Sequence, residues 1–415
     1  MNKRHGIASV VFGLQVLTCL AGLSTALASG SSYSRFGVGD LVRFGSSRLD
    51  AMGGTGIALL GDGFINRLNP AGLAGITHTR ISGGFEYSSF FSKDNHGSDR
   101  YSRGTFKGLA FAIPVDKAYG ITLLLETSPY SNVNYALQQR DTIVTQDFYG
   151  TGGLSLLSFG GSITPVNKLS LGFKLNYLFG RIQQFGRFDF VDPTFLDSDI
   201  SRSDYHSGFN LTAGAIYEGT GDLLNAPSLS PLALGFVIST PAKLSVNRES
   251  ILTTAESFDT TASSSGKVDI PLALGFGVSY LFDSRYYLTA DVYLQNWESA
   301  KFFGSHPAEI RNSARVGVGF ESLPQRETET FWRRVAYRAG FYYNSTYYRI
   351  NNKPVDEWFV TGGVGVPIGP DGRIDIGLHV GFRGTTADNL QRDTIVRLTL
   401  SLSASEAWFM KLEDE

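Results

Sequence analysis

The sequence predicts an all-β protein: a transmembrane antiparallel β-barrel of about 14 strands with an N-terminal hatch, or plug, inside its lumen. Three observations support this prediction. Apolar and polar residues alternate over stretches of roughly 10–15 residues, longer than the average strand of globular proteins. Short turns alternate with longer polar connections along the chain. Glycine and aromatic residues are abundant, with 48 Gly, 30 Phe and 19 Tyr in 415 residues.

The N-terminus has the pattern of a secretory signal peptide. Lys3 and Arg4 precede a largely apolar stretch, Ile7–Leu23, and Ala26–Ala28 has the small-x-small pattern that signal peptidase cleaves. We therefore expect residues 1–28 to be removed and the mature chain to be exported to an outer membrane. Lipoprotein processing at Cys19 is the alternative, but the residue before it is larger than such sites normally accept.

The composition argues against several functional classes. Cys19 is the only cysteine, so cleavage excludes disulfides, thiolate metal sites and cysteine nucleophiles. A formal net charge of −2 gives no basic footprint for nucleic acid. Neither G-x-S-x-G nor H-E-x-x-H occurs, and the histidines are scattered. We therefore expect no cofactor, no metal, no nucleic-acid partner and no enzymatic activity.

The barrel prediction covers residues 76–415 and depends on a hydrophobic period of two. Between Gly372 and Gly384, the even-numbered residues from Ile374 to Phe382 are apolar, whereas the odd-numbered ones are Arg, Asp, His or Gly. The same alternation occurs in Lys168–Gly180, Tyr286–Trp297 and Thr394–Ser403. A soluble sandwich would also alternate, but a tilted strand that crosses a bilayer needs about 9–11 residues, which these stretches supply. We expect the apolar faces to contact lipid.

The connections between these stretches fall into two classes. Short turns are expected at residues 115–117, 166–167, 283–285 and 369–372, with two looser turns at 219–230 and 321–331. Longer polar loops are expected at residues 92–100, 131–146, 187–204, 246–267, 304–311, 349–357 and 387–392. Their regular alternation predicts an even strand number with both barrel ends on one side, as in outer-membrane barrels.

Basic residues on the polar faces should point into the lumen. By the phase of the alternation, they are Lys174, Arg315, Arg338, Arg373, Arg383 and Arg397. Polar barrel interiors carry such cations paired with acids, and we expect Asp291 and Asp375 among the partners.

The segment from Ser29 to Gly75 is rich in glycine and alternates only weakly. A phosphate cradle would need G-x-G-x-x-G, but Leu59 occupies the position of the third glycine. A disordered leader would carry fewer apolar residues. A compact hatch is the third interpretation, and residues 29–75 are assigned to it. The residues of the hatch expected to line a ligand site are Phe36, Phe44, Met52, Ile57, Leu59, Phe64 and Leu68.

Three stretches resemble the FadL family of outer-membrane transporters for long-chain fatty acids and other hydrophobic molecules. They are "NPAGLA" at Asn69–Ala74, "LSLGFKLNYLFGRI" at Leu169–Ile182, and the predicted hairpin Ile270–Phe302. The hatch motif comprises Asn69, Pro70, Ala71 and Gly72. The resemblance implies a fourteen-stranded barrel, a hatch that rearranges, and a lateral exit at a kinked third strand.

The predicted third strand, Ala118–Ser131, contains Pro129, which cannot donate a ladder hydrogen bond. Pro129 therefore either interrupts pairing in the wall or simply ends the strand at its loop. No fatty-acid carboxylate site can be matched residue by residue. The chain also continues past Trp408-Phe409, where barrels of this kind usually end on an aromatic residue.

Two functions follow as expectations. The first is passive uptake of hydrophobic small molecules such as long-chain fatty acids by a monomer surrounded by outer-membrane lipids. The second is a non-transporting FadL-fold barrel that docks secretion-system or surface proteins, as PorV-type subunits do, because Ser31–Gly54 is not a FadL hallmark. A continuous apolar tunnel would favour transport, whereas a sealed lumen with a broad apolar outer surface would favour docking.

Overall fold

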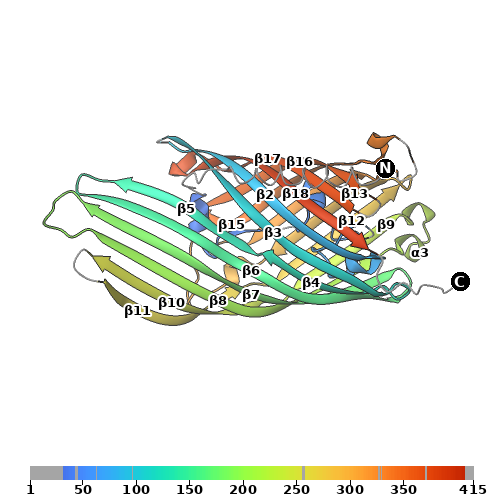
Figure 1. The fold of residues 1–415 in the computed structure, drawn as a ribbon, viewed down its shortest axis with the longest axis horizontal. Coiled ribbons are helices and arrows are strands. Elements are labelled where there is room, and N and C mark those ends of the chain that lie inside the picture. Colours follow the sequence, from blue (N-terminus) through green and yellow to red (C-terminus); the bar gives the residue numbers. More distant parts are fainter. Residues whose placement is uncertain are drawn as a thin grey trace, which may run out of the picture.

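The computed structural model describes residues 31–406, except 43–44, 62, 96, 255–257, 326–327, 329 and 370–371. The predicted signal peptide, Phe44 and Trp408-Phe409 lie outside the described residues. The chain forms an elongated barrel of tilted strands, with short helices inside it and at its ends (Figure 1). In the part of the chain that is described, no helix is both long and apolar enough to cross a membrane.

Eighteen strands occur within the described residues, and their bounds follow in chain order. The first nine are β1 Asp40–Leu41, β2 Thr79–Lys93, β3 Ser98–Asp116, β4 Ile121–Pro129, β5 Ser131–Arg140, β6 Val144–Val166, β7 Leu169–Phe190, β8 Ser198–Tyr217 and β9 Leu232–Ser239. The second nine are β10 Ala242–Thr254, β11 Phe258–Ile270, β12 Ala273–Phe282, β13 Tyr286–Gln295, β14 Ser313–Ser322, β15 Ala336–Ile350, β16 Lys353–Ile368, β17 Gly372–Gly384 and β18 Arg392–Glu406.

The helices are short. The α-helical turns are α2 Ser47–Ala51 and α3 Thr220–Leu223. The 3₁₀ turns are η1 Ser32–Arg35, η2 Pro70–Gly75, η3 Pro227–Leu229, η4 Trp297–Ser299, η5 Phe331–Arg334 and η6 Ala387–Asn389.

All described neighbours in the barrel wall pair antiparallel, and β18 closes the wall against β2, with Glu406 opposite Thr79. Three barrel strands are each divided in two: β4 with β5, β9 with β10, and β11 with β12. β4 and β5 both pair with β6, and β9 and β10 both pair with β8. The closed wall therefore has fourteen strands, which confirms the predicted fold class.

A proline lies at each division. Pro129 ends β4, Pro241 precedes β10, and Pro271 separates β11 from β12. Proline has no N–H to donate to the ladder and is confined to the edges and interruptions of sheets. The chain can therefore bend at these positions without leaving a main-chain donor unpaired.

The side chains of the wall have the predicted orientation. Leu398, Leu400 and Leu402 point outward and are 39–55% exposed, whereas Thr399 and Ser401, between them, are buried. A stacked sandwich would bury those leucines between its sheets. The apolar outer face instead matches the lipid-facing band of a membrane barrel.

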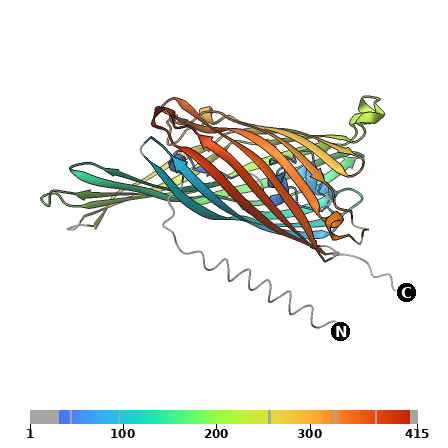
Figure 2. The ribbon, with the colours of Figure 1, turned by 90° about the horizontal axis from the view of Figure 1, so that it is seen from above.

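One group of predicted loops is wrong. Most of residues 131–146, 187–204 and 246–267 belongs to three long hairpins, β5–β6, β7–β8 and β10–β11. These hairpins project beyond the rest of the wall, at the left of Figures 1 and 2. Outside a bilayer both faces of a strand contact water, so apolar residues no longer alternate with polar ones and the composition resembles that of a loop.

We call this projection the outer extension: residues 133–153, 180–207, 245–254 and 258–266. The end of the barrel that carries it is called the outer end, because the longer extensions of such barrels face away from the cell. The opposite end is the inner end, and it carries the start of β2 and the end of β18. It also carries the tight turns between β6 and β7 and between β12 and β13, in which Lys168, Asp283 and Ser284 have positive φ angles.

Candidate functional site

The hatch, residues 31–75, occupies the lumen between the two ends of the barrel (Figure 1). Ser46 caps α2 by accepting a hydrogen bond from the Leu49 N–H at 3.4 Å. The hydroxyl of Thr361 on β16 accepts from the Gly53 N–H at 2.9 Å and donates to the Ala51 carbonyl at 2.9 Å. Helix α2 is too short to pair all of its own main-chain N–H and C=O groups. The hydroxyl of Thr361 in the wall therefore pairs with those at and after its C-terminal end.

Glycines on the inward faces of the wall allow the hatch to approach its backbone. A Cβ added at Gly214 would lie 1.9 Å from Asn69 Oδ1, and one at Gly172 would lie 2.3 Å from the Pro70 carbonyl carbon. A Cβ at Gly340 would lie 2.2 Å from the Gly53 nitrogen. Glycines of the wall are therefore necessary for the fit of the hatch.

The four residues of the hatch motif are buried and form part of this seat. Asn69 caps η2 by accepting from the Ala71 N–H at 3.0 Å and donates to the Ile57 carbonyl at 2.7 Å. Pro70 occupies the first position of η2, where no N–H is needed. Gly72 accepts a main-chain hydrogen bond from Gly61 at 2.7 Å. The motif therefore joins distant parts of the hatch to each other and to the wall.

The residues proposed to line a ligand site separate into three groups. Met52, Leu59 and Phe64 are buried with Leu49 in a cluster inside the hatch. Phe36 packs against the aromatic cluster at the outer mouth. Ile57 and Leu68 line a cavity between the hatch and the wall.

Buried ion pairs fasten the hatch to the wall. Arg48 of α2 pairs with Glu321 on β14, and Arg338 on β15 pairs with Glu321 and with Asp375, each at 2.8 Å. Arg373 lies 3.0 Å from Asp375. This chain of charges crosses from the hatch through three wall strands.

A second set of ion pairs fastens the opposite side of the hatch. Lys107 on β3 lies 2.8 Å from Asp50 of α2 and 3.3 Å from Glu86. Glu126 on β4 accepts from Lys174 at 3.4 Å and lies 3.5 Å from Arg67 of the hatch. Burial raises the pKa of the Asp50 carboxyl, and the ammonium of Lys107 opposes that rise.

The six predicted lumen cations all point inward and contact polar partners. Lys174, Arg338 and Arg373 belong to the ion pairs above. Arg315 donates to the Gly53 carbonyl and lies over the Tyr342 ring. Arg383 pairs with Asp40 and Asp393, and Arg397 pairs with Glu86. Asp375 is a partner as expected. Asp291 instead accepts from the N–H groups of Gly56 and Ile57, at 2.7 and 3.0 Å.

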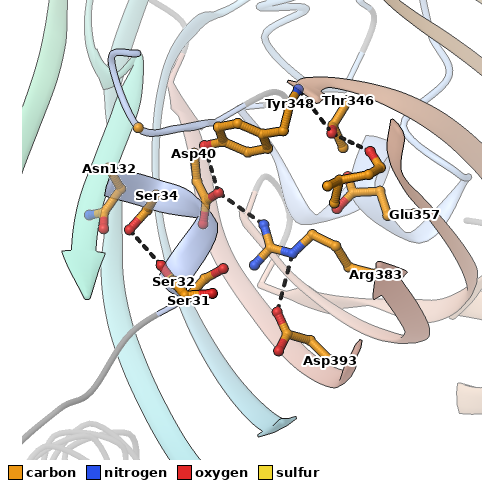
Figure 3. Close-up of polar contacts among 12 residues, drawn as sticks. Ser31, Ser32, Ser34, Asp40, Asn132, Thr346, Tyr348, Glu357, Arg383 and Asp393 are labelled. Atoms are coloured by element: carbon orange, nitrogen blue, oxygen red, sulfur yellow. Dashed lines mark hydrogen bonds and ion pairs between the residues drawn. The ribbon is translucent and has the colours of Figure 1, made fainter. Parts of the chain in front are cut away.

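The N-terminal part of the hatch closes the outer mouth (Figure 3). Asp40 accepts from Arg383 at 2.9 Å and from the hydroxyl of Tyr348 at 3.0 Å. Arg383 also lies 3.5 Å from Asp393. Tyr33 donates to the Gln391 carbonyl, and its burial raises its pKa to about 12.

Aromatic residues complete the seal. The Tyr347 ring lies 4.4 Å from that of Tyr348 and 4.7 Å from that of Trp297, and all three are buried. They belong to the largest apolar cluster of the described residues, together with Val38 of the hatch. These side chains therefore pack the hatch against the wall at the outer mouth, beside a cavity of about 70 Å³ that Asp40, Tyr347 and Arg383 border.

The wall is interrupted beside Pro129. β3 pairs with β4 from Leu109, opposite Thr127, towards the inner end, but no pairing of β3 with β5 occurs among the described residues. β5 instead follows β6 alone. The hatch strand β1 covers the free edge at its base, with Asp40 opposite Asn132 and Val42 donating to the Tyr130 carbonyl at 2.9 Å. Pairing of β4 with β3 ends at Thr127, two residues before Pro129, whereas its pairing with β6 continues to Pro129, opposite Ser155. Pro129 both ends β4 and lies beside this interruption, so its role stays a prediction.

A cavity of about 180 Å³ lies next to this interruption. Its apolar lining includes Leu41, Val42, Tyr130 and Leu156, which the sequence analysis did not select. Charged residues also border it, namely Arg67, Glu126, Lys174, Asp291 and Arg315. The sequence predicted Ile57 and Leu68 as lining residues and Lys174 and Arg315 as lumen cations, but the lining comes from many segments of the hatch and the wall that only the fold brings together.

The sequence profile of one family, BamG, matches residues 7–413. The chain belongs to the BamG family. Among proteins with curated functions, none has a sequence that matches this BamG-family chain.

Solved structures share the fold of this BamG-family protein. A Pseudomonas aeruginosa FadL homologue has a TM-score of 0.64 at 14% identity, over 89% of this chain and 99% of its own. The Pseudomonas putida toluene transporter TodX has a TM-score of 0.61 at 14% identity, over 89% and 100%. The Ralstonia pickettii toluene transporter TbuX has a TM-score of 0.58 at 17% identity, over 88% and 99%. The BamG-family chain therefore has a FadL-like fold.

Proposed function

We propose that this BamG-family barrel is a docking subunit of an outer membrane, which binds a protein partner through its outer extension and does not conduct solute. One observation carries the proposal: beyond the outer mouth, six strands continue as an open sheet whose two edges have no partner strand over Tyr135–Arg140 and Phe258–Gly266 among the described residues.

Most of each edge of the outer extension has no partner strand. The Ser34 hydroxyl of the hatch accepts from the Asn134 N–H at 3.1 Å and donates to its carbonyl at 2.9 Å. Beyond this contact, among the described residues, β5 from Tyr135 to Arg140 pairs only with β6, and β11 from Phe258 to Gly266 pairs only with β10. An exposed edge presents a row of N–H and C=O groups to any other chain, and soluble proteins normally cover or charge such edges. A partner strand that adds to either edge would satisfy them.

The surface of the outer extension is also apolar for a region outside a bilayer. Its tips and faces expose large apolar side chains: Ile143, Tyr149, Val191, Phe195, Leu196, Ile200 and Tyr205. The Tyr149 ring stacks on that of Phe185 at 4.6 Å. Exposed apolar side chains that gather outside the bilayer-facing wall support a site of protein–protein contact.

The lumen supports the same conclusion. For the hatch to move, Arg48, Asp50 and Arg67 would have to leave their carboxylate or ammonium partners on the wall. Breaking one buried pair leaves an uncompensated charge at a cost of about 3–5 kcal/mol. Three such pairs favour a hatch that stays in place.

The experiment shortens the outer extension. In the shortened barrel, Asn-Gly replaces residues 138–147 and a second Asn-Gly replaces residues 184–202. The first forms a tight hairpin between the paired residues Leu137 and Phe148, and the second forms one between the paired residues Gln183 and Ser203. The matched control shortens the inner-end connection at residues 219–231. When membranes are solubilised in mild detergent, we expect the native barrel and the control to be extracted in a stoichiometric complex with the partner protein. The shortened barrel should be extracted without that partner. Complexes of equal mass from all three would overturn the proposal.

Uptake of hydrophobic molecules is the second candidate, because the 180 Å³ cavity lies beside the interrupted third strand and the fold is that of toluene transporters. Its test is flux of toluene or a long-chain fatty acid into liposomes that contain the purified barrel. Flux that Leu156→Trp abolishes, by filling the cavity, would favour transport over docking. Flux no greater than in empty liposomes would remove this candidate.

A further inference from the structure

We propose that the outward face of the outer extension binds a saccharide, carried by lipopolysaccharide of the outer leaflet or free in solution, in a cavity of about 210 Å³ beside the rings of Tyr149 and Phe185. The cavity lies on four neighbouring strands, β6, β7, β8 and β10, and not on the open edges formed by β5 and β11. The inference does not depend on the docking function, because its test leaves both edges in place.

Two aromatic rings form the apolar side of the cavity. Tyr149 on β6 is the direct pairing partner of Phe185 on β7, and their rings stack at a centroid distance of 4.6 Å. Phe159 on β6 and Phe179 on β7 lie on the same faces of these strands and are exposed on the lipid-facing wall, so Tyr149 and Phe185 also face outward. Tyr149 is 46% exposed, which leaves ring surface open to a ligand. The C–H groups on one face of a sugar ring carry partial positive charge, which the negative face of an aromatic ring attracts.

Polar side chains form the other side of the cavity. Ser201 on β8 is the direct pairing partner of Phe185. Asp199, on the same face of β8, is opposite Arg187 on β7 and opposite Thr253 on β10. All of these residues border the cavity. Side chains directly opposite each other on neighbouring strands are about 5 Å apart, so the polar groups and the rings lie next to each other.

The polar groups of the cavity are available to a ligand. Among the described residues, neither the carboxylate of Asp199 nor the hydroxyls of Tyr149, Ser201 and Thr253 take part in a hydrogen bond. Arg187 donates its Nε–H to a neighbouring carboxylate of β7 at 2.9 Å, which leaves both of its Nη groups. The hydroxyls of a sugar each donate and accept, and a carboxylate beside a guanidinium supplies an acceptor and donors for them. Such groups beside an aromatic surface match a saccharide better than they match a hydrocarbon.

The size and height of the cavity suit the saccharide layer of an outer membrane. About 10–15 Å³ of such space holds one water molecule, so a cavity of about 210 Å³ has room for on the order of a dozen waters or one sugar ring. On β7, the outward residues from Leu171 to Phe179 are apolar or aromatic, and the charged Arg181 follows them. Phe185 lies two outward positions beyond Arg181, which corresponds to roughly 15 Å above the lipid-facing residues on a tilted strand. Saccharides of the outer leaflet occupy this height.

The test measures binding of the detergent-purified full chain to immobilised lipopolysaccharide of the source organism by biolayer interferometry. A variant with Tyr149→Ala and Phe185→Ala loses both rings and should bind at least tenfold more weakly than the native barrel. The matched control, Phe331→Ala with Trp332→Ala, removes another exposed aromatic pair, in the connection between β14 and β15, and should bind like the native barrel. Heat-shifted gel mobility checks that each variant is folded.

A second variant, Asp199→Asn, keeps both rings and changes one exposed side chain, so it tests the site even if the double variant does not fold. It removes the negative charge from the acceptor that faces the sugar hydroxyls. Binding should weaken severalfold, because hydrogen bonds to a charged acceptor are stronger than those to a neutral one.

Two further arms identify the source of the saccharide. Lipid A without its core saccharide should bind the native barrel as weakly as intact lipopolysaccharide binds the double variant. If the released core saccharide competes as well as intact lipopolysaccharide does, the site takes the saccharide from solution; at least tenfold weaker competition would assign it to the saccharide on its lipid. Equal binding of lipopolysaccharide and lipid A, no binding of lipopolysaccharide by the native barrel, or equal binding by the native barrel and both variants would overturn the proposal.

Discussion

The closed part of the barrel and the outer extension are built from the same strands in different surroundings. Strands β6, β7 and β8 run without a break through both. In the closed part their inward faces contact the hatch. The outer extension projects beyond the closed wall (Figure 2), and near its base it buries a smaller apolar cluster of Val133, Tyr135 and Ile182. The register between β6 and β7 and between β7 and β8 does not change where the closed part meets the outer extension. The change in surroundings therefore arises because neighbouring strands bend away or end there.

The difference between the two regions indicates which of them contributes most to the stability of the barrel. In the closed part the wall strands pair on both sides except where β3 and β5 separate beside Pro129, and buried charges are matched across the hatch. In the outer extension the two edge strands each have one neighbour, and large apolar side chains are exposed. Substitutions should therefore be costly inside and mild outside, and the following predictions test that contrast from the largest expected effect to the smallest.

The largest effect is expected for Glu321→Ala. It leaves Arg48 without its partner and deprives Arg338 of one of two carboxylates, all within the dry lumen. Removing one member of a buried pair costs about 3–5 kcal/mol. Urea titration of heat-shifted gel mobility measures the free energy of unfolding. The control Lys168→Ala breaks an exposed pair with Asp222 and should cost less than about 1 kcal/mol; equal losses would contradict the contrast.

Trp297→Ala and Tyr149→Ala compare aromatic residues of the two regions. Trp297 is fully buried at the outer mouth, and truncation of a buried aromatic residue costs about 3–5 kcal/mol. Tyr149 is 46% exposed on the outer extension, and its truncation should cost about 1 kcal/mol or less. The same titration measures both variants. If the Tyr149 variant loses as much stability as the Trp297 variant, the outer extension is part of the folding core.

Gly340→Leu tests the seat of the hatch. Its side chain would start 2.2 Å from the Gly53 nitrogen, so the hatch must shift. Overpacking of this kind costs about 1–3 kcal/mol. Conductance of single barrels in planar bilayers should rise as the lumen opens. The control Gly97→Ala has no atom within 4 Å of its new Cβ and should conduct like the native barrel.

The smallest effect is expected for Ser46→Ala, which removes the cap of α2 and should cost about 1 kcal/mol. Ser46→Asp, which can also cap, should recover most of that loss. A loss as large as that of Glu321→Ala would mean that local helix structure, and not the wall, holds the hatch in place.

Much of the fold could be predicted because a period of two repeats in every spanning strand. Leu398, Leu400 and Leu402 face lipid as their spacing requires. The inward direction of Lys174 and Arg338 followed from the same spacing. Residues 131–146 and 187–204 were misjudged because strands with two solvated faces lose that signal.

The candidate site was much less accessible from the sequence. Pro129 predicted an interruption, but no residue near it in the chain indicates that β1 would cover it. Gly172 and Gly340 could not be recognised as seats for the hatch, because their role is defined by the backbone of Asn69–Pro70 and Gly53. Such contacts join residues that are far apart in the chain.

The sequence by itself determined which side of each strand faces lipid, the even number of strands and the presence of a glycine-rich segment before the barrel. Local periodicity and composition are sufficient for these, because every spanning strand meets the same two environments. Only the tertiary structure decided which carboxylate neutralises which cation, where the wall opens, and that three hairpins outgrow it. Those outcomes depend on the register between strands and on the seating of the hatch, which no single stretch of sequence contains.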